Sequence, residues 1–340
     1  MPTNNHPKPI DGLMRYMRDE KNIDISGSTQ KRKLRNIGYY HGYKGYRYVN
    51  NPNNKLTFSS FNEITAIYDF DAKIKAILYP QVMFIETALK NYVLEILLKK
   101  SNSDSFNVIY SKLLNNCNSF SPVGKKYKNA HEREKAEEKY KTALKKRLDL
   151  RDRVYNVQTT AYGNKNKIAE HFIHKDINLP IWAIFELLSL GEFGHFVSCI
   201  NYDTRKDIST SLGIRPSVDS NALLTQRLIY AVKDLRNSIA HNDVIFDTRF
   251  RSSNIDNQVI SNLTNETGIT NISFNTITDY MILVVYMLKM FETPKLDIRR
   301  LINEFDSAKE SLRKLIPINI YNQIIHTDTV VKINSIKAYI

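Results

Sequence analysis

Apolar residues recur at three- and four-residue spacing through most of the chain, and this period constrains the fold more than any other feature. The clearest run spans residues 58–99, with apolar positions at Ile64, Ile67, Tyr68, Ile74, Ile77, Leu78, Phe84, Ile85, Ala88, Leu89, Tyr92 and Ile96. Such spacing places the side chains on one face of a helix. No alternating apolar–polar pattern, the mark of strands, persists anywhere in the sequence. The sequence therefore predicts an all-α fold.

The same period predicts the remaining helices. They are expected over 132–150, from Pro180 to about Gly191, over 221–240, over 278–292 and over 297–325. Pro80 is expected to break the first helix or to start a new one, because proline lacks the backbone N–H that a helix needs. The polar stretch 157–167 is predicted to be mobile, and the Asn/Ser/Thr-rich stretch 252–278 is predicted to be irregular.

These patterns suggest three segments. Residues 1–55 form a basic, tyrosine-rich N-terminal segment, 56–292 a helical domain with a basic insertion near 101–167, and 293–340 a C-terminal helical extension. With 340 residues, the chain can bury a sizeable core.

The sequence favours a soluble, cytoplasmic protein that does not contact membranes. The longest apolar stretch, residues 281–288, is far shorter than the roughly 18 residues of a membrane span. The start, residues 1–11, has no apolar signal-peptide core. Cys117 and Cys199 show no metal-binding spacing and are expected to pack as small core residues, so we expect neither a metal nor a cofactor.

A formal charge of +14 makes nucleic acid the expected partner, because such a surplus attracts polyanions. The cations concentrate in two regions: residues 1–48 hold ten Lys/Arg against four Asp/Glu, and residues 125–153 hold twelve against six. In the second region, interleaved charges at helical spacing fit a solvent-exposed helical hairpin. Contact with RNA phosphates is the alternative, through Lys125, Lys126 and Lys128.

In the first basic region, tyrosines alternate with cations and glycines between Arg35 and Tyr48. That composition suits stacking on bases combined with neutralisation of phosphates. The candidate RNA-binding residues are Arg35, Tyr39, Tyr40, Lys44, Tyr46 and Arg47. The alternative is structural, with the tyrosines filling a crevice of the main domain.

One short motif in the sequence contains residues that could catalyse a reaction. Glycine-rich phosphate loops, nucleophile elbows, paired metal-binding histidines and zinc quartets are absent from the sequence. What remains is Arg236-Asn237-Ser238-Ile239-Ala240-His241 at the predicted end of a helix. The imidazole could transfer a proton to or from an RNA backbone oxygen, and the guanidinium could neutralise the charge that gathers on the phosphate. Asn237 could orient either group.

At about 100° per residue, Asn237 and His241 lie within about 40° of each other on the helix, whereas Arg236 lies about 140° from His241. The motif therefore needs a helix that ends at His241, or a second protomer. The helix C-terminus would favour the imidazolium form. The alternative is a capping histidine and a surface arginine that do no chemistry. A second match, Arg35-Asn36 with His41, is interpreted as coincidence or RNA contact, because Gly38 and the tyrosine run argue against a helix-end geometry.

An ordered set of short motifs resembles the bacterial abortive-infection (Abi) proteins of the AbiD/AbiF type. The motifs are Ile37-Gly38-Tyr39-Tyr40, Tyr68-Asp69-Phe70-Asp71, Ile85-Glu86, Leu179-Pro180-Ile181-Trp182 with Glu186 and Gly191, and Leu235-Arg236-Asn237 with Ala240-His241. That family is similar to the HEPN superfamily of helical-bundle ribonucleases. The resemblance implies a HEPN-like bundle with N-terminal and C-terminal helical extensions. It also implies phage defence by metal-independent RNA cleavage that leaves a cyclic phosphate.

The resemblance also assigns roles to residues and partners. Arg236, Asn237 and His241 match the catalytic motif, and Glu86 matches a supporting polar position on a neighbouring helix. The family's usual second histidine is replaced by Asn242, which is expected to stand in as a donor. The implied partners are substrate RNA, a second copy of the chain that completes the site in a homodimer, and a small non-coding RNA that acts as inhibitor or antitoxin.

Two other functions remain open from the sequence. The first is a non-catalytic RNA-binding defence protein that holds phosphate with the same residues. The second is a metal-dependent nuclease that uses Asp69, Asp71 and Glu86, which is disfavoured because Asp69 and Asp71 are about 200° apart on a helix.

Overall fold

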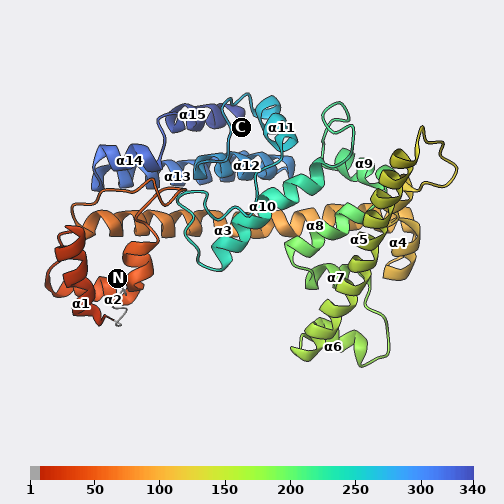
Figure 1. Ribbon diagram of the computed structural model, residues 1–340, viewed down its shortest axis with the longest axis horizontal. Coiled ribbons are helices and arrows are strands. Elements are labelled where there is room, and N and C mark those ends of the chain that lie inside the picture. Colours follow the sequence, from red (N-terminus) through yellow and green to blue (C-terminus); the bar gives the residue numbers. More distant parts are fainter. Residues whose placement is uncertain (1–7) are drawn as a thin grey trace. The chain divides into compact units, whose positions relative to one another are not determined.

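The computed structural model describes residues 8–340, and within that range the protein is built from helices alone (Figure 1). The helices are α1 (Ile10–Arg15), α2 (Gly27–Tyr39), α3 (Phe61–Ser101), α4 (Phe106–Lys112), α5 (Ala130–Gly163), α6 (Lys167–Ile173), α7 (Ile181–Leu187), α8 (Leu190–Cys199), α9 (Tyr202–Ser211), α10 (Leu224–Ala240), α11 (Asn257–Thr267), α12 (Ile277–Met290), α13 (Lys295–Leu315), α14 (Ile318–Ile324) and α15 (Thr329–Tyr339). Three short helical segments join them: η1 (Tyr16–Glu20), η2 (Tyr40–Lys44) and η3 (Asn116–Phe120). The prediction of an all-α fold is confirmed.

Contacts divide the chain into two compact units. The first unit contains the described residues up to Val82 together with Asp234–Ile340, and the second contains Met83–Lys233. Both α3 and α10 contribute residues to each unit. The three segments expected from the sequence stay a prediction, and the first seven residues of segment 1–55 lie outside the described range.

In the first unit, the core is built around α12. Its residues from Ile277 to Leu288 are all buried, because the helix packs against α11, α13 and α15 (Figure 1). Burying an apolar surface of this kind is the main favourable term in folding. The first half of α3 adds its own buried apolar side chains, among them Ile67 and Ile74.

In the second unit, the long helix α5 packs against α6, α7 and α8. The side chain of Arg147 on α5 donates hydrogen bonds to the backbone carbonyls of Leu114 and Tyr110. Cys117 and Cys199 are both buried and unpaired, as expected, and burial raises the pKa of Cys199 to about 11.

The expected break at Pro80 is wrong, because α3 continues through it. Pro80 and Ala76, whose carbonyl loses the helical hydrogen bond, are both solvent-exposed, so water can satisfy that carbonyl. Buried apolar residues on both sides, including Ile77 and Val82, hold the helix together at this point.

Two polar segments fold where irregular or mobile chain was expected. Residues 157–163 extend α5, and α11 lies inside the stretch 252–278. The Asp256 side chain caps α11 by accepting a hydrogen bond from the Gln258 N–H, and Gly268 ends the helix in the left-handed conformation. The helix expected over 297–325 is divided into α13 and α14, with Pro317 preceding α14.

No helix in residues 8–340 combines the length and the hydropathy that crossing a membrane requires.

Candidate functional site

The Arg-Asn-His motif lies where α10 ends, as predicted. His241 still donates its backbone N–H to the Asn237 carbonyl, at 2.9 Å, and so completes the last helical turn. The next two residues close the helix: the Asn242 N–H donates to the Ile239 carbonyl at 3.2 Å, and the Asp243 N–H donates to the Ser238 carbonyl at 2.8 Å. This pattern is a Schellman motif, with Asn242 in the left-handed conformation at φ 57°.

The motif side chains are accessible at this helix end. His241 is exposed, whereas Arg236 and Asn237 are partly exposed. The Arg236 guanidinium donates from Nη1 to Oδ1 of Asn237 over 3.3 Å. The two neighbouring side chains therefore meet, although a regular helix turns adjacent residues apart by about 100°.

Asp71 of α3 anchors the segment that follows the motif. Its Oδ1 accepts hydrogen bonds from the backbone N–H groups of Ile245 and Phe246, at 2.7 and 2.6 Å. Its Oδ2 accepts from the Tyr46 hydroxyl at 3.0 Å and pairs with the Lys75 ammonium at 2.8 Å. The carboxylate is fully buried, and a buried charge needs such a set of partners. For Asp71, the sequence favours capping or buried hydrogen bonding over a role in the site, and the structure shows the buried hydrogen bonds.

Lys75 connects this anchor to Asn242, the residue that follows His241. The ammonium of Lys75, which is itself buried, donates to Oδ1 of Asn242 over 3.0 Å. The Oδ1 atom of Asn242 therefore accepts a hydrogen bond, and the expected donor role belongs to its Nδ2 group. Lys75 lies four residues after Asp71, a spacing that brings the two side chains together on a helix, and this signal was available in the sequence.

The N-terminal segment packs against the same loop. A Cβ atom added to Gly45 would lie 3.1 Å from Cγ2 of Val244, so the Gly45 backbone packs closely against the Val244 side chain. Arg249 donates to the carbonyls of Gly45 and Tyr48, at 2.8 and 2.5 Å, and its guanidinium is paired with Asp247. Residues 40–48 and 242–249 are thus fixed to one another.

The tyrosines of this segment divide into two groups. Tyr46 is fully buried, and its burial and the nearby Asp71 carboxylate raise its pKa, so stacking on RNA bases is closed to it. Tyr39 is partly buried, with ring contacts to Tyr16 and Tyr43, while Tyr40 is 55% exposed. Tyr46 therefore fills a crevice of the protein, as the structural alternative predicted. The exposed ring of Tyr40 can still stack on an RNA base.

The predicted RNA-binding cations lie on the surface of their units. Arg35, Lys44 and Arg47 are exposed in the first unit, and the Lys44 ammonium lies 5.5 Å from the centre of the Tyr39 ring. Lys125, Lys126 and Lys128 are exposed in the second unit, before α5. All six side chains can therefore reach a polyanion.

The carboxylates of the metal-dependent alternative are engaged in other interactions. Asp69 is exposed and pairs with Lys33 at 2.8 Å. Glu86, in the second unit, pairs with Lys90 at 3.0 Å, and the same ammonium donates to the Leu188 carbonyl. Within residues 8–340, no group of three or more His, Cys, Asp or Glu side chains is arranged to hold a metal ion.

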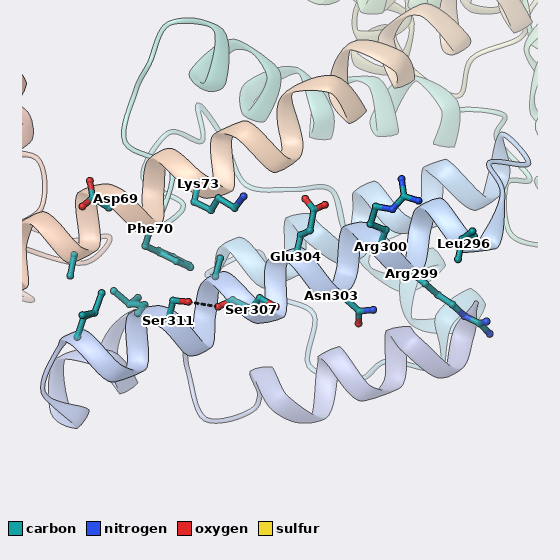
Figure 2. A pocket seen from close by; sticks show the side chains of 14 residues that line it. Asp69, Phe70, Lys73, Leu296, Arg299, Arg300, Asn303, Glu304, Ser307 and Ser311 are labelled. Atoms are coloured by element: carbon teal, nitrogen blue, oxygen red, sulfur yellow. Dashed lines mark hydrogen bonds between the residues drawn. The ribbon is translucent and has the colours of Figure 1, made fainter.

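A groove of about 730 Å³ lies in the first unit between α3 and α13 (Figure 2). Apolar side chains such as Phe70 and Leu312 line it, with Lys73, Arg299 and Arg300 among the polar ones. Arg236, Asn237 and His241 are not among the residues that line the groove. The three predicted catalytic residues therefore lie at the end of α10, outside the lining of this groove.

The sequence matches the model of one protein family. A family model described as Abi-like protein matches residues 32–247, well over half of the chain, and this range includes the anchor at Asp71 and the motif at 236–241. Neither a curated protein nor a solved structure is significantly similar to the chain.

Proposed function

The chain belongs to the Abi-like protein family, the abortive-infection proteins of phage defence, and we propose that it acts in this defence as a metal-independent ribonuclease of the HEPN type. The site is the end of α10. The observation that carries the proposal is the exposed His241 imidazole, which follows Arg236 and Asn237 on a helix end anchored to α3.

In this mechanism, His241 transfers a proton during attack of a ribose 2′-hydroxyl on the adjacent phosphate. Such proton transfer by a positioned side chain contributes about 10²–10⁴-fold in rate. Arg236 neutralises the charge that develops on the phosphate oxygens, and the contact with Asn237 holds its guanidinium on the motif side of the helix. The products are a 2′,3′-cyclic phosphate and a free 5′-hydroxyl.

We further propose cytoplasmic RNA as the partner, both as substrate and as a small inhibitory RNA. Exposed cations such as Arg35, Lys44 and Arg47 would neutralise its phosphates. In the proposed homodimer, two α10 ends meet across a two-fold axis. Sedimentation that gives only monomer, with and without RNA, would contradict the dimer.

The test of the function is RNA cleavage by His241→Ala. The variant should bind RNA with the affinity of the wild type and lose cleavage by about 10²-fold or more, because only the proton-transfer group is removed. His174→Ala, which removes an exposed histidine from the second unit, is the matched control and should cleave normally. Cleavage at the wild-type rate by His241→Ala would reject the assignment.

The alternative is a non-catalytic RNA-binding protein that uses the same exposed cations. It predicts RNA binding without cyclic-phosphate ends in the bound RNA, for the wild type as well as for both histidine variants. Sequencing of RNA that co-purifies with the protein, including its end chemistry, separates the two functions.

A further inference from the structure

A second histidine, His41, lies beside the loop that follows the catalytic motif. It belongs to η2, and its ring contacts Tyr40, Tyr46 and Tyr68 at centroid distances of 5.1, 6.5 and 6.1 Å. Its Nδ1 atom is buried and makes no hydrogen bond. A buried ring nitrogen without a partner is costly. The side chain as a whole is partly exposed, which leaves Nε2 as the nitrogen that a substrate can reach.

The contacts of the anchor place His41 and His241 at one site of the first unit. Tyr46, five residues after His41, is bonded to Asp71, and Asp71 is paired with Lys75. Lys75 in turn bonds Asn242, the residue next to His241. Three chain segments therefore converge, and each is held by a buried hydrogen bond or ion pair.

The charges around His41 favour its neutral form. Burial and the Lys75 ammonium lower its pKa, while the carboxylates of Asp71 and Asp243 oppose this shift without cancelling it. Lys75 and Asp71 belong to α3, and Asp243 belongs to the loop after α10. A neutral imidazole at pH 7 has a free lone pair, so it is ready to accept a proton.

We propose that His41 is the general base of the reaction and that His241 is the general acid. The inference rests on the proposed function, because it assigns the second proton-transfer group to the same site. Nε2 of His41 takes the proton of the 2′-hydroxyl while the 2′-oxygen bonds to phosphorus. The bond from phosphorus to the 5′-oxygen breaks, and that oxygen receives a proton from His241. Atoms and charges balance without any further reactant.

The test compares two substrates and two variants. A 5′-bridging phosphorothiolate RNA has a sulfur leaving atom that departs without a proton, so it needs a base but no acid. His241→Ala should be slow on normal RNA and recover on the phosphorothiolate. His41→Asn should be slower than the wild type by about 10²-fold or more on both substrates. The fall of the wild-type cleavage rate at acidic pH should also disappear in His41→Asn.

The controls separate a chemical role from a structural one. His41→Gln keeps a polar side chain of similar reach, and its thermal unfolding midpoint should match that of the wild type while cleavage stays impaired. His174→Asn should behave as the wild type on both substrates. If the wild type cleaves RNA and His41→Asn cleaves equally fast, or recovers on the phosphorothiolate, the role of His41 is rejected and the proposed function stands. If the wild type cleaves neither substrate, the proposed function itself fails.

Discussion

Asp71 is the residue on which the geometry of the site most depends. Each of its carboxylate oxygens has two partners, and these come from three separate parts of the chain: the Tyr46 hydroxyl, the Lys75 ammonium and the N–H groups of Ile245 and Phe246. A buried carboxylate is tolerated only when charge and hydrogen bonds compensate the loss of water. Here this compensation also fixes the loop that carries Asn242.

Replacing Asp71 by Asn should therefore destabilise the protein strongly. The amide oxygen can still accept from the backbone, but the Lys75 ammonium loses its anion, and breaking a buried pair in this way costs about 3 kcal/mol or more. Urea unfolding should show a clearly lower midpoint. Asp69→Asn, two residues away on α3 and exposed, is the matched control and should stay within about 0.5 kcal/mol of the wild type. Equal midpoints for the two variants would show that the buried pair is not needed.

At the scale of elements, glycines decide how η2 packs. Gly38, at φ 70° and ψ 170°, interrupts the helical geometry of α2 just before η2 begins. A Cβ atom on Gly42 would lie only 2.6 Å from Cδ1 of Leu34, which is fully buried, so α2 and η2 approach each other closely here. The sequence associates Gly42 with an RNA-binding composition, and it uses Gly38 as an argument against a helix end at His41. In the structure they permit the contact that places His41.

Gly42→Ala should lower stability by about 1–3 kcal/mol, because the added methyl forces a buried leucine to move. RNA cleavage should fall with it, since η2 carries His41. Gly163→Ala on α5, where a Cβ would meet nothing within 4 Å, should instead leave stability unchanged or raise it by up to about 1 kcal/mol. Thermal unfolding of both variants measures the contrast, and an unchanged midpoint for Gly42→Ala would contradict the close packing.

At the scale of the whole molecule, the charge of +14 sets the expected partner class. Exposed cations occur in both units: Lys44 and Arg47 in the first, Lys125–Lys128 in the second. Because RNA phosphates carry condensed counterions, binding through such cations releases ions and weakens as salt rises.

RNA affinity, measured by fluorescence anisotropy, should therefore fall steeply between 50 and 200 mM salt, by about 10³-fold or more if six or more phosphates are contacted. Replacing the three lysines in Lys125–Lys128 by Gln should reduce the slope of log affinity against log salt by about 2–3. A control with Lys295, Arg299 and Lys314 replaced by Gln removes the same charge from α13 and should keep the slope of the wild type. Equal slopes for all three proteins would exclude Lys125–Lys128 from the interface.

The sequence predicted the helices that are marked by apolar residues at regular, short spacing. The period of apolar residues gave the helices over 61–101, 224–240 and 277–290 within a few residues. It failed at Pro80, where packing on both sides outweighs the missing hydrogen bond. The apolar period also did not predict α11. Its capping residue, Asp256, lies in the Asn/Ser/Thr-rich stretch that the sequence predicts to be irregular.

By itself, the sequence determined that this chain is helical, that it is strongly cationic and that it belongs to the Abi-like family, because the apolar period, the net charge and an ordered set of short motifs can all be followed along the chain. Only the tertiary structure decided that Asp71 accepts a hydrogen bond from Ile245, 174 residues away in the chain. It likewise decided that Lys75 donates a hydrogen bond to Asn242, 167 residues away. It also brought His41 to the same loop. Helical spacing reports on neighbours within one turn, whereas these buried partners are chosen by how distant helices pack.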